Sequence, residues 1–297
     1  MSGCVLVVGA GGRLGAAIVN VFADRDVRAH TRASLDLADP AAVERSVAAA
    51  APAVVINCAA FNLVDEAEDR ATDALAINAF GVRTLARAAE QAGAVLVHYG
   101  SDFVFDGRAT EPYDEDAPPS PGSTYAVSKL LGEWFALDAP RSFVLRVESL
   151  FGAAPGWTGR RGSLDTIVDG LQRGRPVTVF SDRVVSPSYV DDVALATKHL
   201  IDSDAVAGLY HCVNSGAATW TQVAEEAARV LGVTPRFEVV TMDQVPMRAA
   251  RPRFCALANR KLAAAGFPMP AWEDALRRWL AGRESGTPHD TMDGVHG

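Results

Sequence analysis

The sequence predicts an α/β fold in which a doubly wound parallel β-sheet carries helices on both faces and is followed by a smaller C-terminal α+β region. In residues 1–150, short continuous apolar runs alternate with longer helical patterns, which is typical of strands buried on both faces of a parallel sheet. After about Phe151 this alternation becomes less regular. The 297 residues, 49% of them hydrophobic, suffice for a large part and a small part that each bury a core.

The first half is predicted to contain strands that alternate with helices. Its apolar runs place strands at 5–8, 27–29, 54–57, 94–99 and 143–147. Its helical patterns place helices at 14–22, 40–50, 72–92 and 125–137. Asp39 is the expected N-cap of the second helix, because its carboxylate accepts hydrogen bonds from free N–H groups and Pro40 suits the first helical position.

The second half is predicted to begin with a loop at 152–162, which is rich in Gly, Pro and Arg. Helices are expected at 164–173, 190–201, 219–231 and 272–280, and strands at 177–180 and 209–213. Residues 283–297 are polar and contain several glycines, so we expect a disordered tail.

Composition narrows the possible partners. The net charge of −8 disfavours a nucleic-acid partner, since phosphate binding needs a basic face. No apolar run approaches the roughly 20 residues that span a bilayer, so we expect no membrane association, and the N-terminus does not resemble a signal peptide. The four cysteines are widely spaced, which predicts reduced thiols and a cytoplasmic protein. No Cys/His spacing resembles a metal site, so no metal is predicted.

A glycine turn links the first predicted strand to the first helix. Gly9, Gly12 and Gly15 follow the spacing G-x-x-G-x-x-G, with Arg13 and Leu14 between the last two. Such a turn lets backbone N–H groups and a helix N-terminus approach a pyrophosphate. A lone glycine motif is weak, but its place inside a βαβ unit predicts a Rossmann-type dinucleotide site.

The end of the second strand predicts which nicotinamide cofactor binds. An acidic residue there would hold the ribose 2′-hydroxyl of NAD, whereas arginine accepts the 2′-phosphate of NADP. The chain has Arg32 at this point and no acid until Asp36, which precedes Leu37. We therefore expect NADPH, with NADH as the alternative if Arg32 is only a solvated loop charge.

Three residues form a candidate catalytic group. Tyr125 and Lys129 lie four positions apart on a predicted helix and so share one face. A nearby ammonium favours ionisation of a phenol, whose ordinary pKa of about 10 makes it a poor acid–base catalyst at neutral pH. Ser101 follows the fourth predicted strand, at the sheet edge where ligands gather, and its hydroxyl would bond a substrate oxygen.

Together these residues resemble the dTDP-4-dehydrorhamnose reductase family within the extended short-chain dehydrogenases. The resemblance extends from residue 5 to about residue 280. It rests on the glycine turn, the Tyr/Lys pair and six further blocks. These blocks are 54–68, 76–82, 100–107, 184–192, 208–216 and 272–276.

This resemblance implies an NAD(P)H-dependent reduction of a 4-keto group on a nucleotide-linked deoxyhexose. Tyr125 would protonate the carbonyl oxygen, Lys129 would bind the nicotinamide ribose and tune Tyr125, and Ser101 would orient the carbonyl. It also implies a dinucleotide-binding domain at 1–150, to which 177–213 partly return, and a substrate-binding region at 151–176 and 214–282. Positions matching the family's cofactor contacts or their support are Gly9, Gly12, Gly15, Asp36, Leu37, Ala59, Ala60 and Asn78.

The expected sugar pocket departs from the family pattern. The family's Arg-Thr-Ser-Trp-Val-Tyr-Gly is replaced here by a run that contains Glu148 and Ser149, so the sugar-packing tryptophan is absent. A family tyrosine is Phe103 and a common glutamine is Arg183. The resemblance places Val64, Asp102, Phe103, Glu148, Ser149, Arg183 and Arg251 at the substrate. The resemblance therefore implies dTDP-4-dehydrorhamnose or a related keto-sugar as the substrate.

Other functions stay open at this point. A dehydratase is disfavoured, because Phe103 follows Asp102 where a second carboxylate is needed. A nucleotide-sugar epimerase uses the same motifs. A non-catalytic protein that resembles the regulatory subunit of methionine adenosyltransferase is the alternative from another class. A homodimer is considered, although the sequence does not decide it.

Overall fold

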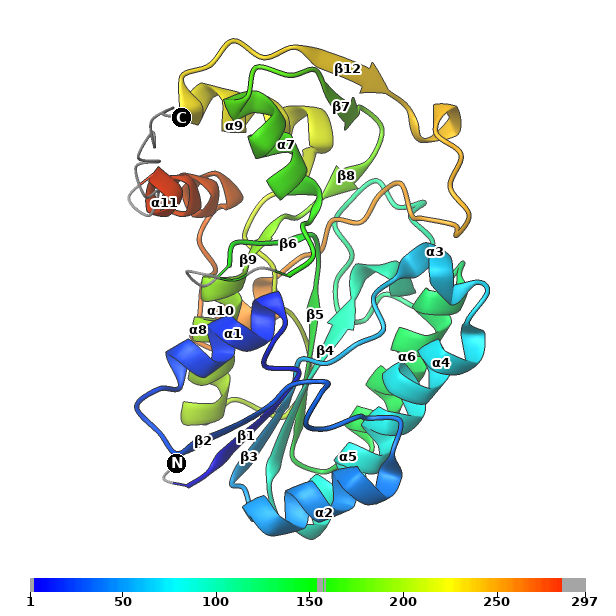
Figure 1. Ribbon diagram of the computed structural model, residues 1–297, viewed down its shortest axis with the longest axis vertical. Coiled ribbons are helices and arrows are strands. Elements are labelled where there is room, and N and C mark those ends of the chain that lie inside the picture. The colour runs from blue at the N-terminus through cyan, green and yellow to red at the C-terminus, as the bar shows by residue number, and fades with distance from the viewer. Residues whose placement is uncertain (1–2, 154–156, 158, 285–297) are drawn as a thin grey trace, which may run out of the picture.

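The computed structural model describes residues 3–153, 157 and 159–284 (Figure 1). Its centre is a six-stranded sheet in the order β10-β5-β4-β3-β1-β2, and every neighbouring pair is parallel. The strand order reverses direction between β1 and β3, and ligands of such sheets bind beyond the carboxyl ends at this point. The strands are β1 (Val5–Val8), β2 (Val27–His30), β3 (Val54–Asn57), β4 (Val95–Ser101), β5 (Ser142–Val147) and β10 (Gly208–His211).

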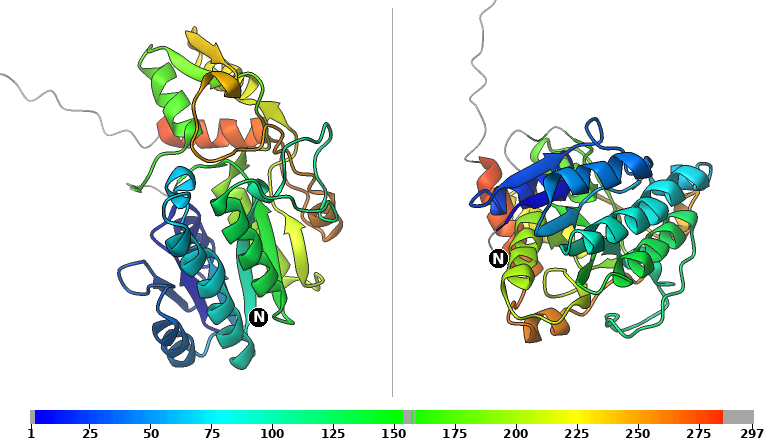
Figure 2. Two further views of the ribbon diagram at one scale, coloured as in Figure 1. Left: turned by 90° about the vertical axis from the view of Figure 1, so that its right-hand side faces the viewer. Right: turned by 90° about the horizontal axis from the view of Figure 1, so that it is seen from below.

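Helices cover both faces of this sheet (Figures 1 and 2). On one face α1 (Arg13–Val21) packs against α8 (Val190–Asp202). On the other face α5 (Gly81–Gln91) lies between α2 (Pro40–Ala50) and α6 (Thr124–Leu137). The doubly wound fold predicted from the sequence is confirmed.

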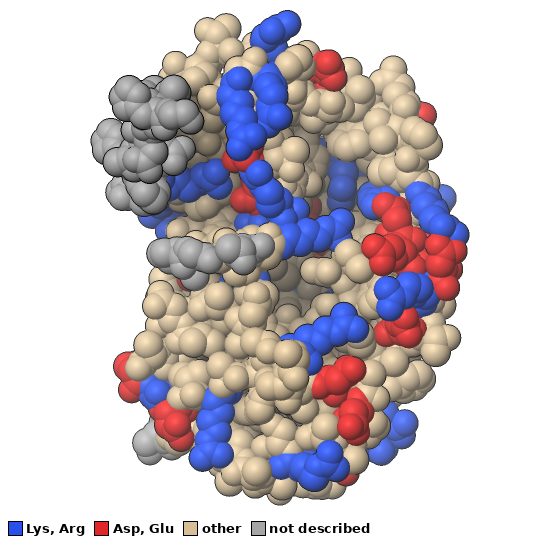
Figure 3. All heavy atoms as spheres, in the orientation of Figure 1, with Lys and Arg blue, Asp and Glu red and all other residues tan. Residues whose placement is uncertain are grey.

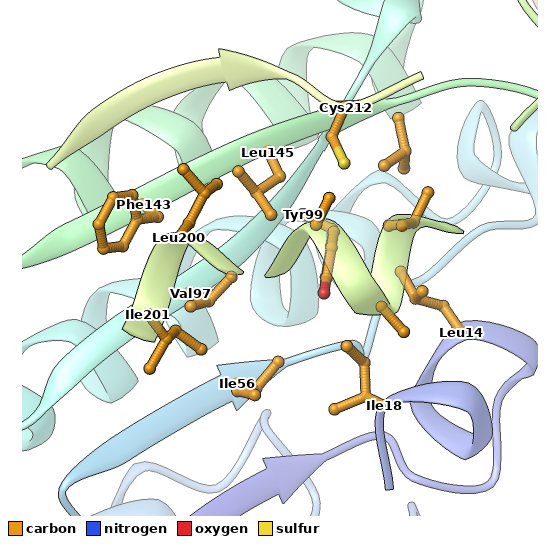
Figure 4. Packing of buried hydrophobic residues seen from close by; sticks show 14 of the residues in the cluster. Leu14, Ile18, Ile56, Val97, Tyr99, Phe143, Leu145, Leu200, Ile201 and Cys212 are labelled. Atoms are coloured by element: carbon orange, nitrogen blue, oxygen red, sulfur yellow. The ribbon is translucent and has the colours of Figure 1, made fainter. Parts of the chain in front are cut away.

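The sheet and α8 share a closely packed apolar core. Figure 4 shows Leu200 and Ile201 of α8 beside Val97 and Leu145 of the sheet, all of them buried. Burying an aliphatic side chain of this size stabilises the fold by about 1.5–3 kcal/mol. The Tyr99 hydroxyl, which also points into this core, is paired with the Thr197 hydroxyl at 2.8 Å.

The helix expected at 72–92 is interrupted. It consists of α4 (Ala71–Leu75), the π-helical turn η1 (Ala76–Phe80) and α5. Within η1 the Asn78 side chain is buried and hydrogen-bonds both Phe61 and Ser128. A π turn inserts an extra residue into a helix and is often found at functional sites. The periodicity of the sequence predicted the helix but could not predict the π-helical turn within it.

The C-terminal region has its own core and short strands. Its helices are α7 (Ser163–Gln172), α9 (Trp220–Leu231) and α11 (Trp272–Glu284), whereas α10 (Arg260–Ala264) packs against β10 and buries Leu262 in the core of the large sheet. Its paired strands are β7 (Val177–Phe180) with β12 (Phe237–Val240), β8 (Val184–Val185) with β11 (Ala218–Thr219), and β6 (Leu150–Phe151) with β9 (Ser188–Tyr189). Large side chains, among them Phe151, Trp220 and Leu276, fill the space between them.

Several short elements of the chain were missed because two to five residues carry no readable periodicity. They are β6, β8, β9, β11, α10 and the short helices α3 (Val64–Ala67), η2 (Asp102–Val104) and η3 (Met242–Gln244), and the longer β12 was also missed. The tail was expected from residue 283, but α11 continues to Glu284, so this boundary was wrong by two residues. The rest of the tail, 285–297, lies outside the described residues, as do 154–156 and 158 of the predicted loop.

The segment 177–213 divides between the two parts of the molecule. Its helix α8 and strand β10 lie with the large sheet, whereas β7, β8 and β9 lie in the C-terminal region. We retain as a proposal the division into a dinucleotide-binding domain at 1–150 and a substrate-binding region at 151–176 and 214–282. Among the helices that the structure describes, none is long and apolar enough to cross a membrane.

Candidate active site

The glycine turn connects β1 to α1 where side chains would not fit. Gly9 has a φ of 83°, and a Cβ added to it would lie 2.5 Å from the Ala59 nitrogen. A Cβ on Gly15 would collide with the Gly9 carbonyl oxygen. Gly12 is the N-cap of α1, and it has no side chain to occupy the first N–H groups of the helix. The turn therefore leaves backbone donors for an anionic ligand.

A cavity of about 560 Å³ runs from this turn along the ends of β2 and β3. We call it the cofactor groove. Arg32 is exposed in its wall, beyond β2, where the 2′-phosphate of NADP was expected. Of the residues predicted to bind cofactor, the groove is lined by Gly9, Gly12, Arg32, Asp36, Leu37, Ala59 and Ala60.

Other predicted cofactor residues do not line the groove. Leu14 is buried in the core that α1 shares with the sheet. Gly15 packs against the Gly9 backbone, so its role is steric. The Asn78 side-chain amide hydrogen-bonds Phe61 and Ser128, and it thereby links the segment after β3 to α6. These positions support the groove from behind because each faces the protein interior.

Arg13 points away from the groove toward the C-terminal region. Its guanidinium donates to the Gly152 carbonyl at 2.7 Å and forms an ion pair with Asp165. It also lies over the ring of Trp157, 4.7 Å from the ring centroid. Trp157 in turn donates to the Gly11 carbonyl at 3.2 Å. Arg13 therefore joins the two parts of the molecule, and a local sequence motif cannot predict this role.

The fold brings the three candidate catalytic residues together. Helix α6 begins after Ser123, whose hydroxyl caps it by accepting from the Ala126 N–H at 3.3 Å, and so places Tyr125 and Lys129 one turn apart. Lys129 is buried and donates to the Tyr99 carbonyl at 2.6 Å. Ser101 ends β4, and its hydroxyl lies close enough to the Tyr125 phenol to influence the pKa of that phenol. The group lies at the carboxyl end of β4, as the sequence predicted.

The two titratable members of this group have shifted pKa values. Burial raises the pKa of Tyr125, and the charge of Asp102 adds to this effect, whereas the Ser101 hydroxyl opposes it. Burial lowers the pKa of Lys129 to about 8, against the opposite effect of Glu133. Burial and the charge of Asp102 together outweigh any lowering of the Tyr125 pKa by Lys129. The phenol holds its proton, as a proton donor must.

A buried ion pair supports the catalytic loop and was missed by the sequence analysis. Glu133 accepts from the Arg146 guanidinium at 2.8 and 3.0 Å, and both side chains are at most 4% exposed. Its other oxygen accepts from the Ser101 N–H at 3.3 Å. Glu133 follows Lys129 by four residues on α6, and this spacing on a catalytic helix was the available signal.

Three of the predicted substrate residues meet beside Ser101. One carboxyl oxygen of Asp102, one of Glu148 and the Cys255 sulfur lie within 4.8 Å of one another, and the Arg183 guanidinium contacts Cys255. Burial raises the pKa of Asp102, and it raises that of Glu148 well above its ordinary value. We assign no metal ion here, because Arg183 already supplies a fixed positive charge.

Phe103 and Ser149 flank this group. The Phe103 ring meets Tyr125 edge-on, with centroids 5.4 Å apart, and the Arg183 guanidinium lies 5.7 Å from the Phe103 ring centroid. Ser149 follows Glu148 with a φ of 43°, which is unusual for a residue other than glycine. Ser149 is partly exposed, and its small side chain stands where the family pattern has tryptophan.

The remaining predicted substrate residues, Val64 and Arg251, line a second cavity of about 600 Å³ between the two parts of the molecule. Arg251 forms a two-pronged ion pair with Asp65 at 2.7 and 2.8 Å, and the pKa of Asp65 falls to about 2, chiefly because of this hydrogen bonding. Figure 3 shows basic side chains around a hollow between the two parts. The arginines that line the cavity are Arg13, Arg160, Arg161 and Arg251.

A third cavity lies within the C-terminal region, between α7 and β7. Its volume is about 550 Å³, and its walls include Phe180, Trp220, Arg175 and Arg183. Aromatic rings beside guanidinium groups suit a flat, polar ring system attached to phosphate. Arg183 belongs both to this cavity and to the group beside Ser101, so the two are neighbours.

Comparison with known proteins agrees with this geometry. The family model described as RmlD substrate binding domain matches residues 3–284. A dTDP-4-dehydrorhamnose reductase of Streptomyces griseus is 36% identical over 282 residues, which cover 91% of this chain and 91% of that protein. A probable dTDP-4,6-dihydroxy-2-methyloxan-3-one 4-ketoreductase of Streptomyces antibioticus is 35% identical over 280 residues and 92% of each chain.

A solved structure shows the same likeness over the whole fold. The dTDP-4-dehydrorhamnose reductase of Bacillus anthracis, in complex with NADP, superposes with a TM-score of 0.88 at 29% identity. The superposition covers 95% of this chain and 100% of that chain. Sequence, fold and family model therefore agree, and the chain belongs to the dTDP-4-dehydrorhamnose reductase family.

Proposed function

We propose that this protein uses NADPH to reduce the 4-keto group of a nucleotide-linked deoxyhexose. The observation that carries the proposal is the meeting of Ser101, Tyr125 and Lys129 at the end of β4, in a fold whose glycine turn opens into the cofactor groove. The relatives named as reductases of 4-keto sugars support the same reaction.

The groove fits a dinucleotide because Gly9 and Gly15 leave no room for a side chain and α1 begins without a capping side chain. Arg32 suits the 2′-phosphate of NADPH, and the NADP complex of the Bacillus anthracis relative supports this choice. NADH is the alternative, since Asp36 also lines the groove. The bound dihydronicotinamide would supply a hydride to the carbonyl carbon.

The chain's own residues supply the proton and hold the carbonyl. Tyr125, kept protonated by burial, donates its proton to the carbonyl oxygen as negative charge develops there. The Ser101 hydroxyl donates to the same oxygen and orients it. Lys129, fixed by its bond to the Tyr99 carbonyl, holds the nicotinamide ribose and stabilises the ionised phenol once the proton has left.

The substrate would lie across the two upper cavities. We assign its sugar to the space beside Asp102, Phe103, Glu148 and Ser149, with Val64 at the edge. Arg160 and Arg251 suit the diphosphate, because guanidinium groups bind phosphate oxygens in pairs. The cavity with Phe180 and Trp220 suits the base. The substrate class includes dTDP-4-dehydrorhamnose and related keto-sugars.

Two further expectations belong to this proposal. A homodimer is supported by exposed apolar side chains on η1 and α6, namely Phe80, Val127, Trp134 and Leu137. A cytoplasmic location is supported by the four cysteines, all of which are free thiols. Light scattering of a Trp134→Glu variant tests the first expectation, and a monomeric wild-type protein would remove it.

The decisive experiment combines the purified protein with NADPH or NADH and a panel of dTDP- and UDP-linked 4-keto-6-deoxyhexoses. Loss of NADPH absorbance should require one of these sugars. Tyr125→Phe should lower kcat by about 10²- to 10⁴-fold, the contribution of a positioned proton donor, without changing NADPH affinity.

Other outcomes are informative too. Cofactor binding without turnover of any sugar would favour the non-catalytic binding protein. Interconversion of sugars without net loss of NADPH would favour an epimerase. Failure to bind either cofactor would contradict the proposal as a whole.

A further inference from the structure

The segment of residues 61–68, which follows β3 and contains α3, lies where three parts of the site meet. We call it the α3 segment. Residues 61–63 line the cofactor groove, and residues 62–66 line the second cavity, between the two parts of the molecule. The helix α3 itself contacts α6, which carries Tyr125 (Figure 1). The α3 segment therefore borders both ligand cavities and the helix of the candidate proton donor.

The last residue of this segment binds the first residue of α6. One carboxylate oxygen of Glu68 accepts from the Thr124 N–H at 2.9 Å, and the other accepts from the Thr124 hydroxyl at 3.0 Å. The first N–H groups of a helix have no acceptor inside the helix, and a negative charge is favourable at this end. Because Thr124 directly precedes Tyr125, Glu68 fixes the backbone just before the candidate proton donor.

Tyr125 is held at two further points from the same side. Its ring packs against a small apolar cluster that includes the buried side chains of Phe61 and Ala67. Its carbonyl accepts from the Ser128 hydroxyl at 2.7 Å, and this hydroxyl accepts from the Asn78 amide at 2.9 Å. The Asn78 amide also binds the N–H and the carbonyl of Phe61. The ring and the carbonyl group of Tyr125 are therefore held by, or through, the α3 segment.

A loop of the C-terminal region anchors the α3 segment from another direction. Asp65 accepts from the Ala249 N–H at 3.0 Å and pairs with Arg251 at 2.7 and 2.8 Å. A helix of one turn is not stable by itself, so contacts of this kind determine where α3 lies. Glu68 therefore reaches Thr124 from a segment that is itself anchored.

We propose that Glu68 positions Tyr125 for proton donation by fixing the first turn of α6. The inference rests on the proposed function, because it needs Tyr125 to be the proton donor. Glu68 is not among the described residues that line the cofactor groove or the second cavity, so it acts through Thr124 and is a positioning residue. A proton donor must lie within about 2.6–3.2 Å of the oxygen that it protonates, and a misplacement of about 1 Å can cost about 10²-fold in rate.

The first test needs neither cofactor nor sugar. Amide hydrogen exchange, resolved by NMR, should be about tenfold faster at Thr124 in Glu68→Ala, as expected for loss of a charge-assisted hydrogen bond. Glu68→Gln should stay within about twofold of the wild type, because its amide can accept from the N–H and donate to the hydroxyl. Unchanged exchange at Thr124 in Glu68→Ala would overturn the proposal.

The matched control for this test is Glu226→Ala. It removes a carboxylate that pairs with Arg229 on α9 at 2.6 Å. This substitution should leave exchange at Thr124 unchanged, because Glu226 lies in the C-terminal region and makes no bond to α6 among the described residues. Equally fast exchange at Thr124 in Glu226→Ala would show a general loosening of the protein and overturn the specific role of Glu68.

The second test measures turnover of NADPH and the best keto-sugar of the panel, at a temperature where circular dichroism shows every variant to be folded. Glu68→Ala should lower kcat about 10- to 100-fold, with KM and the Kd of NADPH within about twofold of the wild type. Glu68→Gln should restore kcat. A purely structural role of Glu68 would lower the melting temperature and leave kcat of the folded protein unchanged, and this result would overturn the proposal, as would an equal loss of kcat in Glu68→Gln.

Thr124→Val provides a second variant, which keeps the N–H bond to Glu68 and loses the hydroxyl bond. It should lower kcat less than Glu68→Ala, and the two substitutions together should cost less than the product of their separate effects, because they remove a shared interaction. Independent effects would contradict action through Thr124. Absence of turnover in the wild type would contradict the proposed function, and the exchange measurement would still decide whether Glu68 holds the start of α6.

Discussion

The cofactor groove and the layer beneath the catalytic loop are built on opposite principles. The groove is formed by a glycine turn, backbone N–H groups and small side chains, and its charged residues Arg32, Asp36 and Arg70 are exposed. The layer beneath the loop, which we call the buried charge layer, consists of Asp102, Glu133, Arg146, Glu148 and Arg183. The two regions adjoin at the carboxyl edge of the same sheet.

Because of this difference, the cofactor groove and the buried charge layer should be sensitive to different kinds of substitution. The groove depends on the absence of side-chain atoms, so added volume should damage it while altered surface charge should only adjust affinity. The buried charge layer depends on compensation between charges, so removal of one partner leaves the other uncompensated in a medium of low polarity. Four substitutions test this contrast, taken from the largest expected effect to the smallest.

Glu133→Gln should have the largest effect, because it leaves the Arg146 guanidinium without its carboxylate. We expect a loss of about 3–5 kcal/mol in the free energy of unfolding, measured by urea denaturation. The control is Glu226→Gln, which breaks the Arg229 pair, where Arg229 is 65% exposed; it should cost at most about 1 kcal/mol. Equal losses in the two variants would remove the distinction.

Lys129→Met should change how stability depends on pH. The pKa of Lys129 is about 8 in the folded chain and 10.5 ordinarily, mainly because of burial. Between these values the unfolded chain binds more protons, so the free energy of unfolding of the wild type should rise with pH. The rise at this residue should total about 3 kcal/mol. Denaturation of the cofactor-free protein across this range should show a smaller rise in Lys129→Met, and parallel curves would contradict the shift.

Gly15→Ala tests the steric basis of the groove. The added Cβ would collide with the Gly9 carbonyl oxygen and displace the start of α1. We expect about 1–3 kcal/mol of weaker NADPH binding, measured by quenching of protein fluorescence. Gly282→Ala on α11 is the control, since a Cβ there meets no atom of the described residues within 4 Å. Unchanged affinity in Gly15→Ala would show that the turn can adjust.

Arg32→Ala should have the smallest effect, and it should change the preference for NADPH over NADH rather than the catalytic activity. Loss of the guanidinium should weaken NADPH binding about tenfold, or about 1.4 kcal/mol, and leave NADH binding unchanged. Arg45→Ala removes an exposed arginine that lies outside the groove and is the matched control. If the binding of NADPH and the binding of NADH are weakened equally, Arg32 does not contact the 2′-phosphate.

The sequence by itself determined the features that depend on neighbours along the chain. Four-residue runs that are mostly apolar predicted β1, β3 and β7 with their correct ends, and Asp39 caps α2 as expected, accepting from the Ala42 N–H at 3.1 Å. The glycine turn and the Tyr125/Lys129 spacing were readable for the same reason, since each forms within one βα unit or one helical turn. The family resemblance then supplied roles for these residues.

Tertiary structure alone decided where separated side chains meet. The bond from Lys129 to the Tyr99 carbonyl, the pairing of Arg13 with Asp165 and the Glu133–Arg146 ion pair join residues that no local pattern connects. It also set the balance of effects at Tyr125, because burial and the charge of Asp102 raise the pKa of this phenol although a lysine lies one turn away. Desolvation depends on every group packed around a side chain, whereas helical spacing depends only on the local sequence. For this reason only the fold could show that Glu148 and Arg183 lie in the same buried group of charges.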